Sequence, residues 1–400
     1  MRNTKTPLEL YVHIPFCIRK CQYCDFLSGP SDQRTRDNYV DALCREIKSI
    51  SQKESYEVVS VFIGGGTPSV LSGEQLCRIM DEIRQAFALS EDAEITMEAN
   101  PGTVSLEQMK LCRKASINRI SLGLQSTVQQ ELDMLGRIHT YEEFLQSYQW
   151  AREAGFDNIN VDLMFAIPGQ TCESWKHNLE TVAELLPEHI SAYSLIIEEG
   201  TPFARKKLIL PTEDEEYQMY EDTAEILRKY GFHQYEISNY AKKGMECRHN
   251  ITYWNLGEYL GLGLGAASYL GGFRFENERD FATYQEIQKE RKLQSEERIT
   301  VSKVPCDVTK EYLWGYQEIH RESCQDEMEE FMFLGLRMCC GVSRKAFYKR
   351  FGIELQEIYQ DALNRLFRQK LLAEDKNHDR IYLTDLGIDI SNTVLAEFLL

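Results

Sequence analysis

Tyr11-Val-His-Ile-Pro-Phe-Cys17-Ile-Arg-Lys-Cys21-Gln-Tyr-Cys24-Asp-Phe26 is the stretch that decides the fold. It places three cysteines at the spacing C-x3-C-x2-C, on a loop directly after a strand-like run. Three thiolates on one loop can bind three irons of a 4Fe-4S cluster and leave the fourth iron open to a small ligand. A structural zinc site usually has four ligands, and no second cysteine pair lies nearby. The sequence therefore predicts an iron–sulfur cluster held by Cys17, Cys21 and Cys24.

The composition is that of a soluble globular protein, with 43% hydrophobic and 27% charged residues in a chain of 400. A net charge of −18 disfavours diffuse binding to polyanions, so we expect no nucleic-acid partner. No apolar run approaches the roughly 20 residues of a membrane-spanning helix, and residues 1–7 lack the apolar segment of a secretory signal. Twelve cysteines without such a signal are typical of a reducing compartment. We therefore predict a cytoplasmic protein.

Strand-like runs alternate with helical patterns six times in the first half of the chain. The strand-like runs are 8–14, 58–63, 94–99, 119–123, 158–165 and 189–197. Such alternation predicts an α/β fold with a parallel sheet and right-handed crossovers, and six units indicate a partial (β/α)6 barrel. Groups suited to chemistry gather at the carboxyl ends of these strands, where barrel sites form. These groups are the cysteine loop, the run Gly64–Gly66, Glu98, Gln125 and Asp162.

The remainder of the chain follows other patterns. We assign residues 1–235 to the barrel, 236–305 to a linking segment that contains His249-Asn-Ile-Thr-Tyr-Trp254, and 306–400 to a smaller domain. Two helical patterns and a short strand-like run predict that this smaller C-terminal domain is mainly helical and winged-helix-like. Its acidic residues disfavour DNA binding, so we interpret the winged-helix-like shape as a way of packing these elements and not as a DNA-binding site.

The cysteine motif is similar to that of the radical S-adenosylmethionine (SAM) superfamily, in which SAM chelates the open iron. Gly64-Gly-Gly-Thr-Pro68 resembles the glycine motif of that superfamily and lies one strand–helix unit after the cysteine loop. Glycine lets the main chain approach the methionine part of SAM closely. The resemblance implies a radical SAM barrel with a 4Fe-4S cluster and SAM as cofactors.

Tyr11-Val-His-Ile-Pro-Phe-Cys17 more narrowly resembles the oxygen-independent coproporphyrinogen III oxidase group, which includes the HemW-type proteins. The match covers nearly the whole chain and includes Glu98-Ala-Asn-Pro101 and Ile120-Ser-Leu-Gly-Leu-Gln125. It implies that Arg137 binds the methionine carboxylate and that the side chains of Glu98 and Asp162 bind a ribose diol or a cationic centre. We assign no catalytic residue. Carried over residue by residue, the resemblance implies a SAM pocket lined by Tyr11, Tyr23, Gly65, Gly66, Thr67, Glu98, Gln125, Arg137 and Asp162.

Three features separate the two branches of this group. Phe26 stands where the oxidases have a further cysteine, and only about ten residues precede Tyr11, where the oxidases have a longer extension. His249-Asn250-Ile-Thr-Tyr253-Trp254 matches H-N-x-x-Y-W, a hallmark of the HemW-type branch. That branch is associated with heme binding and delivery, which makes His249 the natural axial ligand of heme iron. From the residues alone, the alternative is a core histidine held by Asn250 and Tyr253.

Two functions follow from the resemblance. The first is a heme chaperone on a radical SAM scaffold, which binds heme and delivers it to hemoproteins, with membrane-associated respiratory enzymes among the candidate acceptors. The alternative is an oxygen-independent coproporphyrinogen III oxidase, a radical SAM enzyme that decarboxylates porphyrinogen propionates. Phe26 and His249 favour the chaperone. The sequence leaves open whether SAM is cleaved and whether the chain forms a homodimer.

Overall fold

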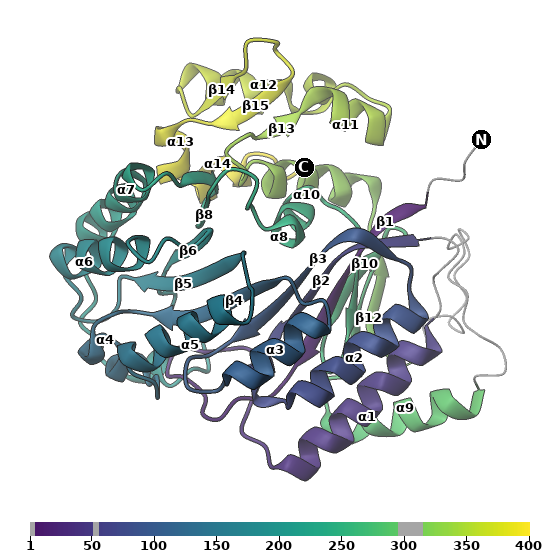
Figure 1. The fold of residues 1–400 in the computed structure, drawn as a ribbon. Helices are drawn as coiled ribbons and strands as arrows, with labels where there is room; N and C mark the ends of the chain where they lie inside the picture. The colour runs from purple at the N-terminus through teal and green to yellow at the C-terminus, as the bar shows by residue number, and fades with distance from the viewer. Residues whose placement is uncertain (1–4, 51–55, 295–314) are drawn as a thin grey trace.

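One sheet of twelve strands runs through the residues that the computed structural model describes, which are 5–50, 56–294 and 315–400 (Figure 1). Six parallel strands in chain order form its middle: β1 (Thr6–Ile14), β2 (Tyr56–Gly65), β3 (Leu89–Ala99), β4 (Arg119–Gln125), β5 (Ile159–Phe165) and β6 (His189–Ser194). No ladder in the described residues pairs β6 with β1, so the barrel is open. The predicted partial (β/α)6 barrel is therefore confirmed.

Helices form the crossovers between these parallel strands, because strands that run in the same direction cannot be joined by tight turns. The connecting helices are α1 (Gln33–Ser49), α2 (Gly73–Ala86), α3 (Leu106–Lys114), α4 (Gln129–Leu135), α5 (Tyr141–Glu153) and α6 (Cys172–Ala183), and α7 (Glu213–Lys229) follows β6. Capping residues in the sequence mark where several of these helices begin. Ser72, for example, caps α2 by accepting from the amide of Gln75 at 3.2 Å, while the Gln75 side chain accepts from the Ser72 amide at 2.8 Å.

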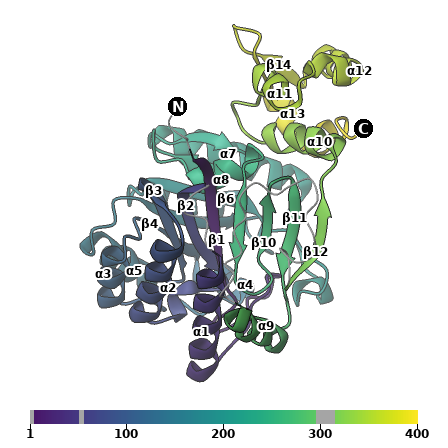
Figure 2. The same ribbon diagram turned by 90° about the vertical axis from the view of Figure 1, so that its right-hand side faces the viewer.

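Short strands extend the sheet beyond both ends of the barrel. The hairpin β7 (His233–Glu236) and β8 (Asn239–Ala241) pairs with β6, and β9 (Tyr259–Leu262) pairs with β1. Figure 2 shows β10 (Ala267–Leu270), β11 (Phe273–Asn277) and β12 (Tyr316–Arg321) continuing this edge beside β1. Segment 236–305 thus supplies strands of the main sheet. The predicted divisions at 235/236 and 305/306 stay predictions, and the second one lies outside the described residues.

The C-terminal part is mainly helical and stands beyond α8 (Arg248–Trp254) at one end of the molecule (Figure 1). It comprises α10 (Cys324–Gly335), β13 (Val342–Ser343), α11 (Arg344–Phe351), α12 (Leu355–Arg368), β14 (Leu372–Glu374), β15 (Arg380–Leu383), α13 (Asp385–Asp389) and α14 (Ser391–Ala396). Helices α11 and α12 and the three-stranded antiparallel sheet of β13, β14 and β15 contribute to a separate core, which includes Phe347, Leu363 and Phe398. This agrees with the predicted winged-helix-like shape. No helix among the described residues is long and apolar enough to cross a membrane.

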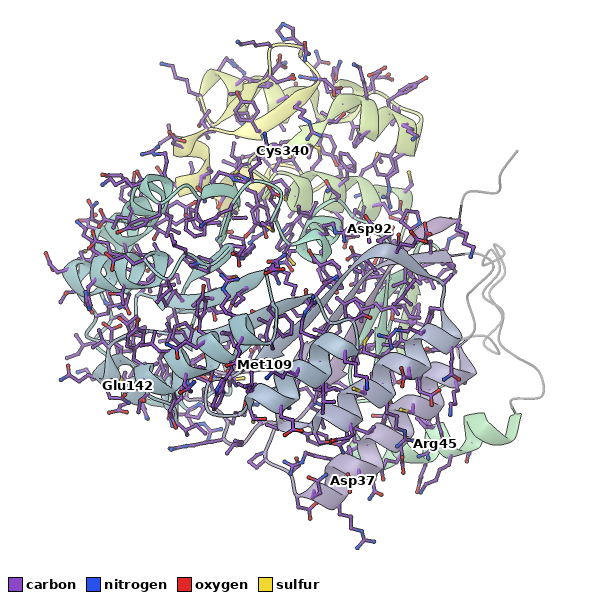
Figure 3. All side chains as sticks on the ribbon, viewed as in Figure 1. Asp37, Arg45, Asp92, Met109, Glu142 and Cys340 are labelled. Atoms are coloured by element: carbon purple, nitrogen blue, oxygen red, sulfur yellow. The ribbon has the colours of Figure 1, made fainter. Side chains whose placement is uncertain are left out.

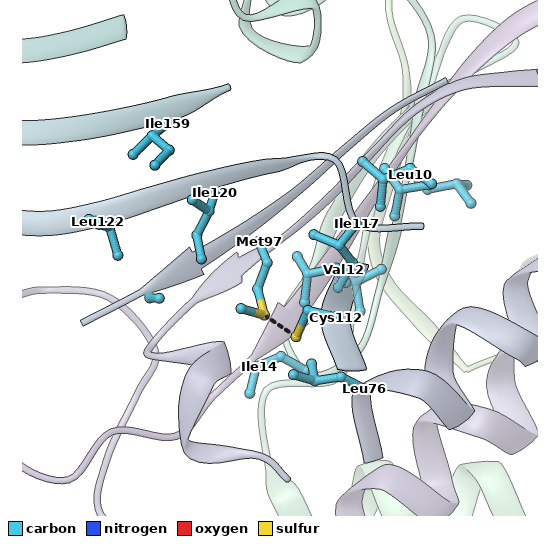
Figure 4. Packing of buried hydrophobic residues seen from close by; sticks show 14 of the residues in the cluster. Leu10, Val12, Ile14, Leu76, Met97, Cys112, Ile117, Ile120, Leu122 and Ile159 are labelled. Carbon is cyan, nitrogen blue, oxygen red and sulfur yellow. Dashed lines mark hydrogen bonds between the residues drawn. The ribbon is translucent and has the colours of Figure 1, made fainter. Parts of the chain in front are cut away.

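The two faces of the barrel strands differ in chemistry. Leu10, Val12 and Ile14 of β1 belong to the main core, which helices α1 and α2 cover, and Figure 4 shows Ile14 beside Leu76. Full burial of one such side chain contributes about 1.5–3 kcal/mol to stability. The alternate positions of β1 carry polar side chains on the opposite face, because strand side chains alternate in direction. This second face supplies the polar groups of the site.

Candidate cofactor site at the cysteine loop

The cysteine loop leaves the carboxyl end of β1 and is closed by backbone hydrogen bonds. The amide of Cys17 donates to the carbonyl of Gly29 at 3.0 Å, and the amide of Gly29 donates to the carbonyl of Pro15 at 3.1 Å. Cys17 is buried, while Cys21 and Cys24 are half-buried, and all three are free thiols. Burial raises the pKa of the Cys17 and Cys24 thiols. The loop therefore holds three unpaired sulfur ligands on a fixed base.

The three thiols line a pocket of about 340 Å³ at the carboxyl ends of the parallel strands, which we call the cysteine pocket. Tyr11 and His249 lie outside it. The structure brings the other predicted SAM-site residues into its wall: Tyr23, Gly65, Gly66, Thr67, Glu98, Gln125, Arg137 and Asp162. These residues come from separate strand–helix units that meet at one edge of the sheet.

The glycine run packs directly against the cysteine loop. The amide of Gly66 donates to the carbonyl of Ile14 at 2.8 Å, and a Cβ on Gly66 would lie 2.5 Å from the carbonyl oxygen of Phe16. Gly65 has a φ of +108°, and a Cβ there would lie 2.5 Å from the His13 ring. Only glycine allows both approaches. The run therefore fixes the start of the cysteine loop and also presents bare main chain to the pocket.

Two carboxylates face the pocket from β3 and β5, which lie on either side of β4. Oε2 of Glu98 accepts from the amide of Gly65 at 3.0 Å. Burial, together with the nearby Asp162, raises the pKa of Glu98 from 4.5 to about 7. Asp162 accepts from Ser121 Oγ at 3.0 Å and from Asn160 Nδ2 at 2.7 Å, while burial raises its pKa. The pocket thus has two carboxyl groups, of which Glu98 titrates near neutral pH.

Arg137 crosses the pocket and is the centre of a network that the sequence analysis only partly found. Its Nη2 donates to Oδ1 of Asn100 and to the carbonyl of Gly123, each at 2.5 Å, and Nη1 lies 3.6 Å from the sulfur of Cys21. Asn100 in turn donates to Thr67 Oγ1 at 2.7 Å. The sequence shows Asn100 within Glu98-Ala-Asn-Pro101, but its turn-like context hid this bridging role.

Tyr193 and Ser121 also belong to the pocket, and sequence reasoning missed both of them. Tyr193 lies near the end of β6 and donates its hydroxyl to Oε1 of Gln125 at 2.8 Å. Gln125 has a φ of +73°, which is uncommon for a residue other than glycine. The only available signal for Tyr193 was its position at a strand end.

The donor set fits the implied cofactors. In a 4Fe-4S cluster each thiolate binds its own iron, so the three sulfurs need not converge on one point. Among the described residues, no three His, Cys, Asp or Glu side chains converge as ligands of a single metal ion. Nε of Arg137 is buried without a hydrogen-bond partner, which suits an anionic group of SAM beside the cluster. Phe26, 63% exposed, lines the same pocket and supplies no fourth sulfur.

His249 lies in the interior, and its side chain is 1% exposed. It is on α8, at the amino ends of the barrel strands, where its amide donates to Glu94 of β3 at 3.3 Å. Asp92, labelled in Figure 3, lies next to α8 and pairs with Arg248 at 3.2 Å. Both ring nitrogens of His249 have partners: Nδ1 lies 2.7 Å from Ser60 Oγ, and Nε2 lies 3.0 Å from the hydroxyl of Tyr253.

Tyr11 lines a second cavity of about 500 Å³ instead of the cysteine pocket. Its hydroxyl lies 2.9 Å from Nδ1 of His13, and its ring stacks on Phe62, which stacks in turn on His249. Tyr11 therefore belongs to an aromatic row behind the glycine run. Its predicted contact with SAM stays a prediction.

The fold is that of the radical SAM superfamily, whose profile matches residues 11–182. The profile of the HemN C-terminal domain matches residues 323–390. The solved structure of coproporphyrinogen III oxidase (HemN) from Escherichia coli, a radical SAM enzyme, superposes with a TM-score of 0.81 over 99% of this chain and 90% of that chain. The sequence identity there is 22%, so this likeness concerns the fold alone.

The chain belongs to the HemW family of heme chaperones. It is 38% identical to the heme chaperone HemW of Bacillus subtilis (strain 168) over 395 residues, which cover 97% of this chain and 98% of that protein. It is also 38% identical to HemW of Lactococcus lactis over 398 residues, 98% of each chain. It is 42% identical to HemW of Escherichia coli (strain K12) over 262 residues, which cover 65% of this chain and 69% of that protein.

Proposed function

We propose that this chain is a heme chaperone that binds a 4Fe-4S cluster, SAM and heme, and delivers heme to hemoproteins. Near full-length similarity to proteins named heme chaperones supports the function. The observation that carries the cofactor part is the cysteine pocket, where three free thiols meet the glycine run. Membrane-associated respiratory enzymes are the acceptors we propose to test first. A homodimer and a cytoplasmic location stay predictions.

Within this proposal, Cys17, Cys21 and Cys24 would hold the cluster, which supplies an open iron for SAM. The bare main chain of Gly65 and Gly66 gives room for the methionine part of SAM. Nε of Arg137 is the free donor for its carboxylate.

The remaining polar groups of the pocket suit the nucleoside part of SAM. Asp162 and Gln125 are held in place by Ser121 and Tyr193, so they can accept hydrogen bonds from hydroxyl groups of a ribose without rearranging. Glu98 titrates near neutral pH and can therefore act there either as a donor or as an acceptor. The pocket as described binds and orients a ligand, and the proposal needs no catalytic residue.

Binding of heme by His249 also stays a prediction. Its burial and its two hydrogen bonds mean that direct ligation requires the ring to leave Ser60 or Tyr253. The H-N-x-x-Y-W segment can take part in heme binding without that movement if another of its residues faces the heme.

One anaerobic sample reconstituted with iron and sulfide tests the proposal. We expect it to bind hemin and to transfer it to a heme-depleted acceptor, measured by the Soret absorption and by recovered acceptor activity. The same sample is assayed for protoporphyrinogen formation from coproporphyrinogen III. Robust turnover with no heme transfer would replace the chaperone with the oxidase.

A further inference from the structure

The second cavity lies where the extended edge of the sheet meets the C-terminal part. Its walls come from β1, α8, β9–β11 and α10, and we call it the tyrosine cavity. Its volume of about 500 Å³ is within the range of about 300–1,000 Å³ that small-molecule sites occupy. Its lining includes Tyr11, Tyr253, Leu256, Tyr259, Tyr269 and Leu334. Aromatic and aliphatic walls of this kind suit a flat, largely apolar ligand.

Tyr253 lines the tyrosine cavity, whereas His249, one helical turn earlier, does not. The i, i+4 spacing on α8 brings the two side chains together. The Tyr253 hydroxyl and the Nε2 of His249 are 3.0 Å apart, and their rings meet edge to face at 4.8 Å. The ring of Tyr253 also meets that of Tyr259 at 4.6 Å. The residue of the hexapeptide that a ligand in this cavity can reach is therefore the tyrosine.

A buried carboxylate stands behind the imidazole. Glu9 of β1 is 1% exposed, and its Oε2 lies 3.1 Å from the Nδ1 of His249. Neither of its carboxylate oxygens has a hydrogen-bond partner among the described residues, so its contact with His249 is an ion-pair distance, while Nδ1 lies within hydrogen-bond distance of Ser60 Oγ at 2.7 Å. A carboxylate next to one ring nitrogen favours a proton there and leaves the other nitrogen as an acceptor for a phenol. Glu9, His249 and Tyr253 thus form a buried row that ends at the cavity.

We infer that Tyr253 is the ligand of heme iron in the tyrosine cavity and that His249 is its positioning residue. This inference rests on the proposed function for the identity of the ligand. Tyrosine is an established axial ligand of heme iron. As the bond between iron and the phenol oxygen forms, the phenol proton passes to Nε2 of His249, and the resulting imidazolium faces Glu9. Iron does not change its oxidation state in this step.

The charges around the cavity indicate how heme would lie in it. Arg274 lines the cavity, but it is paired with Glu330 at 2.5 Å and with Glu322 at 2.9 Å. It is therefore not free to bind a propionate. The macrocycle would lie against the tyrosine rings with its propionates directed to solvent.

The test is titration of the full-length chain with hemin, read by visible absorption and by resonance Raman spectra excited in the phenolate-to-iron band. We expect wild type to show the iron–phenolate vibrations. Tyr253→Phe should lose them and bind hemin at least about tenfold more weakly. Tyr259→Phe is the matched control, because it removes a hydroxyl from the same cavity and should keep the iron–phenolate vibrations. Tyr253→Phe removes one oxygen from a packed ring, so circular dichroism should be unchanged.

Variants at His249 separate a positioning role from ligation. With His249→Gln we expect the iron–phenolate vibrations to persist at a shifted frequency, with an affinity loss of about 10–100-fold. Vibrations unchanged in Tyr253→Phe, or an imidazole signature lost only in His249→Gln, would overturn the inference and leave the chaperone proposal standing. Wild type that binds no hemin at all would instead remove the proposed function.

Discussion

The cysteine pocket and the tyrosine cavity are two sites built in opposite ways on the same strand. The cysteine pocket is formed by short motifs at the carboxyl ends of the parallel strands, and each motif can be recognised in the sequence. The tyrosine cavity collects ordinary tyrosines and leucines from segments far apart in the chain. Tyr11 lines the tyrosine cavity. Two residues further along β1, the His13 ring packs against Gly65, which lines the cysteine pocket. Nearness in space therefore does not make two sites equally visible in sequence.

Removal of the thiols should give the largest effect and should show whether the two regions are separable. Replacing Cys17, Cys21 and Cys24 by Ser should abolish cluster formation, because a serine hydroxyl at neutral pH is no match for a thiolate. We expect complete loss of bound iron and labile sulfide after anaerobic reconstitution. Hemin stoichiometry should stay that of wild type, because the tyrosine cavity contains none of the three cysteines. Hemin binding that disappears together with the cluster would show that the two regions act as one site.

Substitution of His249 by Ala, beside the tyrosine cavity, should lower the free energy of unfolding of the protein. The change leaves the Glu9 carboxylate buried without its partner, which costs about 3 kcal/mol. The free energy of unfolding in urea measures it.

The double variant Glu9→Gln/His249→Ala is the matched control, since it removes the buried charge as well. We expect it to recover a substantial part of the loss. No recovery would mean that the loss comes from the cavity left by the imidazole and not from the carboxylate.

The carboxyl group of Glu98 should make stability depend on pH. Its pKa is about 7 in the folded chain against 4.5 as the ordinary value, so the folded state holds a proton that the unfolded state has released. Stability should therefore be highest below about pH 4.5 for this group and fall as the pH rises to 7, by about 3 kcal/mol in all.

Glu98→Gln should remove this slope, and urea unfolding at a series of pH values compares the two proteins. Asp32→Asn is the control, because hydrogen bonds from Thr35 lower the pKa of this exposed helix-cap carboxyl, so its loss should not remove the fall in stability between pH 4.5 and 7. A slope that persists in Glu98→Gln would assign the titration to another group.

Gly66→Ala should give the smallest of these effects and should affect the cysteine pocket alone. The added Cβ would meet the carbonyl oxygen of Phe16 at 2.5 Å, so the start of the cysteine loop must shift. We expect a loss of about 1–3 kcal/mol and less bound iron, with hemin affinity unchanged. Gly29→Ala, in the same loop with nothing within 4 Å of its added Cβ, should keep wild-type iron content.

Sequence patterns predicted the barrel and most of the cysteine pocket because both depend on local order. Apolar strand runs and helix caps specify each strand–helix unit, and parallel connection then places every strand end on one edge. Glu98, Gln125 and Asp162 were therefore expected together, and the structure has them together. Asn100 and Tyr193 were missed, since a bridging amide and a supporting phenol have no pattern of their own.

The hexapeptide around His249 shows the limit of a motif. Its match to H-N-x-x-Y-W predicts a segment that takes part in heme binding, but it does not say which of its residues faces a ligand. Placing His249 inside and Tyr253 at the cavity required the position of α8 against β1 and β2, with Ser60 and Glu9 behind the ring. Such contacts join residues that are far apart in the chain, so no local pattern records them.

By itself, the sequence determined the cysteine loop, the glycine run, the six strand–helix units and the family to which they belong. Those features are local, because spacing along the chain fixes them. The tertiary structure alone decided that Tyr11 and His249 lie outside the cysteine pocket and that Tyr253 borders a second cavity. That decision depended on how α8 and the added strands pack onto the barrel, where burial and charge pairing over the whole fold determine which side of a residue is left open.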